Sequence, residues 1–179
     1  MITIRPEQPF DYTAIREMIL TVFKETYGTG PLEADLVEAI RASDAYVPEL
    51  SLVALDGDMI VGHSMFSLVQ IERVAGRTEP ALVLAPLGMY KAYQRKGIGT
   101  RLMEQSLKTA RRLGYDWAFL QGSPDYYGRF GFRPDRQFGF VSSFQAEAKY
   151  NMALPLRDDA VEGNGSRLIY PEPTWTPLL

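Results

Sequence analysis

Apolar residues recur along the chain with two different spacings, and these spacings outline the secondary structure. Intervals of three and four residues predict a helix that begins after Asp11, its N-cap, and ends at Gly28, and a second helix that begins at Pro31. Short apolar runs predict strands over residues 2–5, 52–55, 59–71, 81–90, 116–120, 140–144 and 150–156. The last two strands are expected to form an antiparallel pair.

Local signals join these elements into an α/β fold. Asp56-Gly57 predicts a hairpin between the second and third strands, and Pro86 is expected to break the ladder of the fourth strand or to form a bulge. A third helix follows a pair of glycines and carries one small and apolar face, made of Ile98, Leu102, Ser106, Ala110 and Leu113. We expect one domain over residues 1–179, with a mixed-direction sheet, helices on its faces and residues 157–179 as an irregular tail.

The segment Gln94–Thr100 lies between the fourth strand and the third helix and carries the strongest candidate chemistry. Gly97 and Gly99 allow a ligand close approach to the backbone, because neither has a Cβ atom. The first turn of a helix offers unpaired N–H groups to an anion, and Arg95 and Lys96 add positive charge beside them. These features predict a pocket for a phosphorylated cofactor. The alternative is a turn that only opens a helix.

The residues of this loop do not fit two common phosphate-binding motifs. A dinucleotide fingerprint requires a third glycine or an alanine where this chain has Leu102. A nucleoside-triphosphate loop requires Gly-Lys followed by Ser or Thr, whereas Lys96-Gly97-Ile98 has the reverse order. The segment instead resembles the acetyl-CoA-binding motif of the GNAT N-acetyltransferase superfamily, Gln/Arg-x-x-Gly-x-Gly/Ala, as Gln94-Arg95-Lys96-Gly97-Ile98-Gly99.

A second motif carries the same resemblance. Tyr126-Tyr127-Gly128-Arg129-Phe130-Gly131-Phe132 resembles the tyrosine-containing helix of that family, which is followed by Gly-Phe. Together with Gly62-His63-Ser64-Met65-Phe66 and Ala85-Pro86-Leu87-Gly88-Met89, this run most resembles the bacterial YhbS-type branch, and the resemblance covers roughly residues 2–156. It implies a GNAT-like mixed, mostly antiparallel sheet that is splayed between strands four and five, with helices on both faces.

The resemblance implies acetyl-CoA as the acyl donor and assigns residues to it. The diphosphate is expected at the glycine loop, and the pantetheine arm along the backbone of the fourth strand. Ser123 lies where relatives often have a polar side chain against the cofactor, although a helix N-cap before Pro124 is an equal alternative. The expected cofactor-binding residues are Leu87, Gly88, Met89, Gln94, Arg95, Lys96, Gly97, Ile98, Gly99, Thr100, Ser123 and Tyr126, and no metal is expected.

Tyr127 is the expected catalytic residue, because the resemblance aligns it with the tyrosine of the family. A phenol within hydrogen-bond reach can protonate the departing thiolate of coenzyme A, and the alternatives are Tyr126 or simple core packing. The general base stays open, since Glu79 precedes the predicted fourth strand and no glutamate lies within it. His63, the single histidine, is expected to be a half-buried structural residue.

Composition narrows the functional classes further. The net charge of −3 and the pI near 5.3 argue against nucleic acid as a main partner. No apolar run reaches membrane-spanning length and the first residues show no signal-peptide pattern, so a cytoplasmic protein without a membrane partner is expected. With no cysteine, the chain has no thiolate metal site and no cysteine nucleophile.

These observations predict an N-acetyltransferase that moves acetyl from acetyl-CoA to a primary amine by direct attack. Two alternatives stay open: a non-catalytic acyl-CoA-binding or regulatory module on the same fold, and a nucleotide-binding protein. The acceptor is a small-molecule amine or a peptide; in the family it lies over regions that correspond here to residues 24–35 and 138–152, where Glu25, Glu33 and Asp35 slightly favour a cation. A homodimer is compatible with the sequence.

Overall fold

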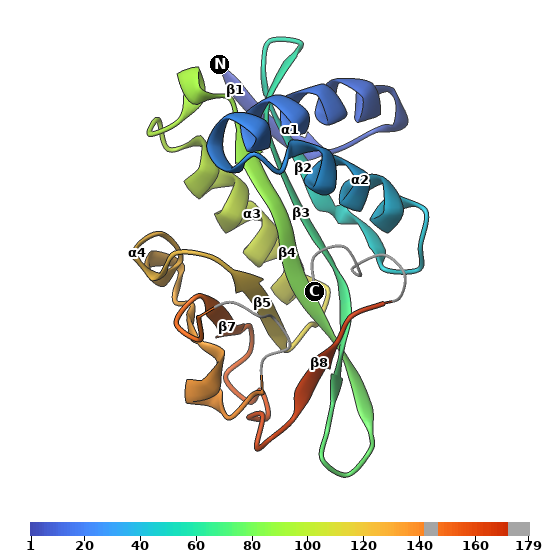
Figure 1. The fold of residues 1–179 in the computed structure, drawn as a ribbon, viewed down its shortest axis with the longest axis vertical. Coiled ribbons are helices and arrows are strands. Elements are labelled where there is room, and N and C mark those ends of the chain that lie inside the picture. The colour runs from blue at the N-terminus through green and yellow to red at the C-terminus, as the bar shows by residue number, and fades with distance from the viewer. Residues whose placement is uncertain (142–146, 172–179) are drawn as a thin grey trace. The chain divides into compact units, whose positions relative to one another are not determined.

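The computed structural model describes residues 1–141 and 147–171 of the chain (Figure 1). The chain divides into two compact units. Unit 1 comprises Met1–Ser67 with Ala85–Thr109, and unit 2 comprises Leu68–Leu84 with the described part of Ala110–Leu179. Two long strands and one helix run from one unit into the other. The single domain expected from the sequence stays a prediction.

Most helices and strands lie where the hydrophobic pattern predicts them. Within the described residues, eight strands form a sheet in the order β1-β2-β3-β4-β5-β7-β6, with β8 paired to β3. The pair β4–β5 is parallel, whereas β1–β2, β2–β3, β3–β8, β5–β7 and β6–β7 are antiparallel, so the expected mixed and mostly antiparallel sheet is confirmed.

The elements have the following bounds. The strands are β1 (Ile2–Pro6), β2 (Tyr46–Asp56), β3 (Met59–Glu72), β4 (Thr78–Met89), β5 (Trp117–Gln121), β6 (Arg133–Pro134), β7 (Asn151–Pro155) and β8 (Arg167–Ile169). The helices are α1 (Tyr12–Tyr27), α2 (Gly30–Arg41), α3 (Ile98–Arg112) and α4 (Pro124–Tyr127). Single 3-10 turns are η1 (Pro9–Asp11), η2 (Lys91–Tyr93), η3 (Gly128–Phe130) and η4 (Asp135–Phe138).

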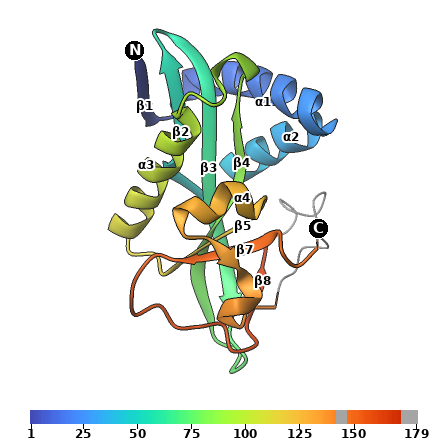
Figure 2. The ribbon, with the colours of Figure 1, turned by 90° about the vertical axis from the view of Figure 1, so that its left-hand side faces the viewer.

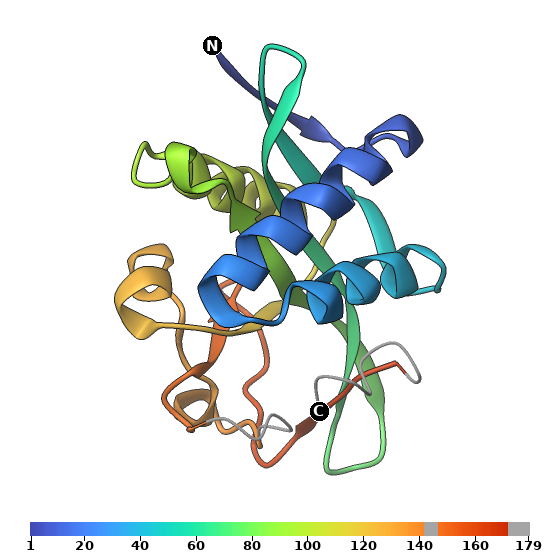
Figure 3. The ribbon, with the colours of Figure 1, turned by 45° about the horizontal axis from the view of Figure 1, so that its top comes forward.

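In unit 1, α1 and α2 cover one face of strands β2 and β3, and α3 covers the other face (Figures 2 and 3). Two glycines lie where the strands contact these helices. A β-carbon at Gly88 would lie 2.9 Å from Cε2 of Phe23 on α1, and one at Gly62 would lie 3.4 Å from Cδ1 of Leu102 on α3. The contact at Gly88 is too close for a β-carbon, so glycine there permits the approach of α1, whereas the distance from Gly62 to Leu102 is an ordinary van der Waals contact.

The first helix forms where its apolar stripe predicts. Its buried residues are Ile15, Met18, Ile19, Val22 and Phe23. It ends at Gly28, which has a left-handed φ of 76° and whose N–H donates to the carbonyl of Lys24 at 3.2 Å. Asp11 occupies the N-cap position of α1, as predicted, but its side chain makes no capping bond to the helix. Its carboxylate instead accepts hydrogen bonds from the Gln8 N–H at 2.8 Å and from Arg5.

The predicted hairpin between the second and third strands is confirmed. Asp56 pairs with Met59 across a two-residue turn, and Gly57 in that turn has a φ of 61°. A left-handed residue suits a tight hairpin because it matches the twist of the flanking strands. The register shifts by one residue between Leu55 and Ala54, and this irregularity, beyond the hairpin, places His63 of β3 opposite Val53 of β2.

In unit 2, the parallel pairing of β4 with β5 is short. Residues 82–84 pair with residues 118–120, and the ladder ends there. The peptide bond between Ala85 and Pro86 is cis, and β4 continues through Pro86 to Met89. The ladder toward β5 therefore stops immediately before the proline segment, whereas the strand itself does not.

The last part of the chain differs from the sequence-based expectation. The tail over residues 157–179 is not wholly irregular, because β8 within it pairs with β3. β7 pairs with β5 and β6 rather than with a strand over residues 140–144; Val141 makes an isolated bridge to Arg167, and residues 142–146 lie outside the described part. Leu113 follows the end of α3 and is 39% exposed, so it is not part of the buried helix face.

Candidate functional site

The glycine loop of unit 1 has the backbone geometry of an anion site. Arg95 and Gly97 adopt left-handed φ angles of 58° and 78°, and α3 begins at Ile98. The N–H of Arg101 donates to the carbonyl of Gly97 at 3.0 Å, which closes the first helical turn. The N–H groups of residues 98–100 therefore have no acceptor within the helix and lie at its positive end. A β-carbon at Gly97 would meet open space, so the backbone there is accessible.

Side-chain hydrogen bonds connect this loop and the turn before it to the ends of β4 and β2. Nε2 of Gln94 donates to the carbonyl oxygen of Met89 at 3.3 Å. The ammonium of Lys96 lies 5.4 Å from the centre of the Tyr93 ring, and the Tyr93 hydroxyl donates to Oδ2 of Asp56 at 3.2 Å. Arg95 is exposed. Arg95 and Lys96 directly precede Gly97 in the sequence, and their role toward an anion stays a prediction.

The end of β4 borders a cleft in unit 1. Leu87 and Met89 are partly buried against an apolar cluster that includes Ile98 and Leu102 of α3, whereas Gly88 lies against α1. The cleft beside this strand end has a volume of about 150 Å³ and is lined by Val22, Glu25, Thr26, Met89, Lys91 and Gln94. Gln94 belongs to both the cleft and the glycine loop, so the two features adjoin each other.

In unit 2, the two tyrosines of the second motif have different surroundings. The ring of Tyr127 lies against Gly122, the residue after β5, because a β-carbon there would overlap the ring. The Tyr126 ring faces the Arg129 guanidinium, whose central carbon lies 4.0 Å from the ring centre. Burial raises the pKa of the Tyr126 phenol, although Arg129 opposes the shift. Tyr127 therefore lies at the carboxyl end of β5, and Tyr126 forms a platform for an arginine.

Ser123 connects β5 to this helix. Its carbonyl accepts hydrogen bonds from the N–H groups of Tyr126 at 3.1 Å and Tyr127 at 2.9 Å, so it starts the helix through its backbone. Ser123 occupies the N-cap position of α4, but its side chain makes no capping hydrogen bond. The predicted site residues therefore fall into two groups: residues 87–89 and 94–100 in unit 1, and Ser123, Tyr126 and Tyr127 in unit 2.

Strand β4 contains a glutamate, contrary to the sequence-based expectation. Glu79 lies within this strand, not before it, but at the opposite end from Met89. Its carboxylate pairs with the Arg73 guanidinium at 2.6 Å and with that of Arg77 at 2.5 Å. Those contacts make Glu79 a structural ion-pair partner.

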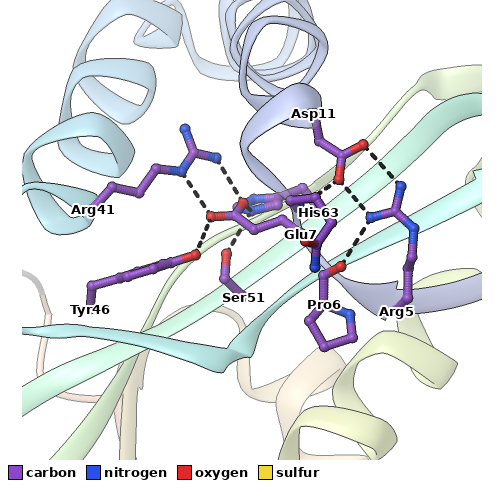
Figure 4. Close-up of polar contacts among 9 residues, drawn as sticks. Arg5, Pro6, Glu7, Asp11, Arg41, Tyr46, Ser51 and His63 are labelled. Atoms are coloured by element: carbon purple, nitrogen blue, oxygen red, sulfur yellow. Dashed lines mark hydrogen bonds and ion pairs between the residues drawn. The ribbon is translucent and has the colours of Figure 1, made fainter.

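His63 is fully buried, not half-buried as expected, and belongs to a polar network in unit 1 (Figure 4). Its Nε2 lies 2.9 Å from Oε2 of Glu7 and 3.2 Å from Oγ of Ser51. The Arg41 guanidinium donates to both oxygens of Glu7, at 2.8 and 2.7 Å, and the Tyr46 hydroxyl donates to Oε1 at 2.9 Å. The network joins the end of β1, the end of α2 and the middle of β2 and β3.

The charges of this network follow from its contacts. Burial alone would raise the pKa of Glu7, but hydrogen bonds from Arg41 and His63 outweigh burial and hold that pKa far below its usual range. Burial lowers the pKa of His63, and Nδ1 of that ring has no partner within the described residues. We therefore assign a neutral His63 that donates from Nε2 to an ionised Glu7. His63 is held as a structural donor, which argues against a role as the general base.

The described residues contain no group of three or more metal-ligating side chains. None of the helices within the described ranges is long and apolar enough to cross a membrane.

Known proteins share this sequence pattern and fold. Residues 3–134 match the acetyltransferase (GNAT) domain family. The chain is 35% identical over 104 residues to YjhQ of Escherichia coli K12, named as an uncharacterized N-acetyltransferase, and the match covers 57% of this chain and 56% of YjhQ. It is 29% identical over 161 residues to YhbS of the same strain, also named as an uncharacterized N-acetyltransferase, with 89% and 90% covered.

Two solved structures resemble the chain over nearly its whole length. The crystal structure of Escherichia coli YhbS in complex with CoA has a TM-score of 0.82 at 26% identity and covers 96% of this chain and 90% of that one. The structure of a GNAT family acetyltransferase from Brucella melitensis in complex with acetyl-CoA has a TM-score of 0.76 at 28% identity, with 96% and 97% covered. Both relatives were solved with the same cofactor type bound.

Proposed function

Because the chain belongs to the GNAT acetyltransferase family, we propose that it transfers the acetyl group of acetyl-CoA to a primary amine. Acetyl-CoA supplies the thioester whose acetyl group is transferred. The glycine loop is the observation that carries this proposal: the N–H groups of residues 98–100 have no acceptor within the helix that begins at Ile98, and Arg95 and Lys96 directly precede that helix start in the sequence. The CoA and acetyl-CoA complexes of the two structural relatives support it.

The residues of the loop fit the diphosphate of CoA. Anions bind at helix N-termini through unpaired N–H groups and the positive end of the helix dipole. Gly97 leaves the backbone accessible, and Gln94 fixes the loop to the Met89 carbonyl. In this proposal the backbone of residues 87–89 holds the pantetheine arm, residues 94–100 hold the diphosphate, and Ser123 and Tyr126 contribute further contacts to the cofactor.

The proposed chemistry assigns one proton transfer to Tyr127. When the amine nitrogen forms its bond to the acetyl carbon, the bond from that carbon to sulfur breaks and a thiolate leaves. The phenol of Tyr127 donates its proton to this thiolate, and the resulting phenolate takes up a proton from solvent before the next turnover. The attacking amine loses its proton to solvent, since no carboxylate of β4 lies near Met89. The chain has no cysteine to carry the acetyl group, which is consistent with direct attack of the amine on the thioester, whereas a serine ester stays a formal alternative.

A non-catalytic acyl-CoA-binding module is the second candidate. One observation favours it: the glutamate of β4 is paired with two arginines at the far end of the strand and cannot serve as a base at Met89. The two candidates share the cofactor and differ only in whether an amine is acetylated.

We expect acetyl-CoA to raise the midpoint of thermal unfolding by several degrees, and NAD and ATP to raise it much less. A ligand present at a hundred times its Kd adds about 2.7 kcal/mol to the free energy of unfolding. Differential scanning fluorimetry with each ligand at equal concentration measures the shift. An equal response to ATP would contradict the acetyl-CoA assignment and favour a nucleotide-binding protein.

Two matched glycine variants test whether acetyl-CoA binds at the glycine loop. Gly97→Ala and Gly76→Ala each place a β-carbon in open space at nearly the same left-handed φ, 78° and 79°, so both lose similar stability from backbone strain. We expect only Gly97→Ala to weaken acetyl-CoA binding, by about tenfold, because it shifts the loop backbone that faces the diphosphate. Equal affinities in the two variants would place the anion site elsewhere.

A further inference from the structure

A second cleft, in unit 2, takes no part in the proposed acetyl transfer. It has a volume of about 430 Å³ and lies between the tip of the β3–β4 hairpin and the loop that precedes β8. Residues 73–75 and 77 form its hairpin side, and residues 161–164 and 166 form its loop side. Figure 1 shows this hairpin next to β8, at the lower end of the view. We call this surface the hairpin cleft.

A buried guanidinium holds the two sides of the hairpin cleft together. Arg73 is 9% exposed, and its guanidinium donates to the backbone carbonyls of Glu162 at 2.8 Å and Val161 at 3.2 Å. The hairpin itself is closed by the N–H of Arg73, which donates to the carbonyl of Arg77 at 2.8 Å. The N–H of Gly76 donates to the carbonyl of Arg73, also at 2.8 Å. These bonds fix both sides, so the surface is formed before anything binds to it.

The centre of the hairpin cleft exposes apolar side chains. Val74 is 78% exposed and Val161 is 56% exposed, and Ala75 beside them is also exposed. Side chains as exposed as these enclose a small molecule poorly, because ligand pockets bury most of the surface of a ligand. Adjacent exposed apolar residues with charges at their rim are typical of a contact with another protein.

The two sides of the hairpin cleft carry opposite charges. On the hairpin side, Arg73 and Arg77 share the single carboxylate of Glu79, so one positive charge is in excess, and the Arg77 side chain is 70% exposed. On the loop side, the exposed Glu162 carries a negative charge. An apolar centre between a positive and a negative side is complementary to the same surface turned by half a turn.

From the exposed valines and the opposed charges, we propose that two copies of this chain associate through the hairpin cleft, related by a two-fold axis. Val74 of each copy lies against Val161 of the other, and Arg77 of each copy lies beside Glu162 of the other. Exposed ion pairs add little affinity, so the valines supply the attraction and the charges set the orientation. A small contact of this kind gives a weak dimer that forms at high protein concentration.

Sedimentation equilibrium of the full chain, from micromolar to near-millimolar concentration, measures this association. We expect a reversible monomer–dimer equilibrium for the parent. In Val74→Asp the dimer Kd should rise at least tenfold, since a charge then lies in the apolar centre. Val141→Asp is the matched control, because Val141 is 57% exposed in the same unit but does not line the cleft. It should leave the dimer Kd within a few-fold of the parent.

An exchange of charges tests the two-fold geometry. Arg77→Glu alone places two carboxylates beside each other, so we expect the dimer Kd to rise severalfold. Adding Glu162→Arg to the same chain restores opposite charges and should return the Kd to within a few-fold of the parent. Circular dichroism melts show that each variant is folded. The Kd for acetyl-CoA should be the same in all of them, because the hairpin cleft is not part of the proposed cofactor site.

Three results would overturn this dimer. The first is a parent that stays monomeric up to near-millimolar concentration. The second is a dimer that Val74→Asp and Val141→Asp weaken equally, since the contact would then lie on another surface. The third is association that continues beyond two copies, because a two-fold contact closes at the dimer.

Discussion

Tyr127→Phe is expected to lower kcat by about 100-fold and to leave the Kd for acetyl-CoA within a few-fold of the parent. The substitution keeps the ring, which lies against Gly122 and 6.2 Å from the centre of the Phe132 ring, so packing should survive. It removes the proton that we assign to the departing thiolate. Steady-state kinetics with the best amine from a screen, and titration calorimetry with acetyl-CoA, measure the two quantities.

Tyr126→Phe is the matched control, because it removes the same group from the neighbouring residue. The Tyr126 ring supports Arg129, whose Nε donates to the Tyr126 backbone carbonyl at 3.0 Å, and the substitution keeps both contacts. We expect a much smaller fall in kcat. If Tyr126→Phe is the variant that loses activity, the two tyrosines have exchanged roles. If neither loses activity, water protonates the thiolate and general-acid catalysis by this pair is wrong.

Arg41→Met is expected to lower the free energy of unfolding by about 3–5 kcal/mol. The variant leaves the ionised Glu7 buried without its bidentate partner, and the remaining donors, His63 and Tyr46, are both neutral. Urea unfolding followed by circular dichroism measures the change. Arg16→Met is the control, since Arg16 bridges Asp35 and Glu38 on the exposed surface of the helix pair and should matter far less. Equal losses in the two variants would contradict the network account.

The same network predicts how the stability of the parent depends on pH. The pKa values of His63 and Glu7 are both lowered in the folded protein, so the unfolded chain binds more protons in acid. Stability should fall first below about pH 6.5, where an unfolded histidine becomes protonated, and further below about pH 4.3, where an unfolded glutamate does. Urea titrations at several pH values test this. Stability that rises toward acid would mean that His63 is protonated in the folded network.

The parts of the fold that the sequence predicts correctly are those encoded by contiguous residues. The glycine loop, the hairpin at Gly57 and the end of α1 at Gly28 each depend on the backbone freedom of one residue within a short segment. Periodicity likewise placed α1 and α3, because each helix buries one stripe of side chains. These elements can be predicted from the segment alone, because they do not depend on what the segment contacts in the folded protein.

The features that escaped prediction depend on residues far apart in the chain. Glu7 and His63 are separated by 56 positions, and although the apolar strand around His63 indicates burial, no local signal identifies Glu7 as its partner. β8 is a short strand, and it pairs with residues 70–72 of β3, which lie about a hundred positions earlier in the chain. The composition of β8 alone does not indicate this pairing. Only a signal for pairing over long distances in sequence, such as covariation among relatives, would have shown these contacts. The cleft beside the end of β4 is of the same kind, since residues of α1 and of the segment after β4 line it together.

Incubation of the protein with acetyl-CoA and a set of primary amines, followed by mass spectrometry, tests the central claim most directly. The proposed function predicts an amine product that is heavier by one acetyl group, together with an equal amount of free CoA thiol. Tyr127→Phe should form this product far more slowly than the parent. Tight binding of acetyl-CoA without an acetylated product from any amine would contradict the enzyme and leave an acyl-CoA-binding module.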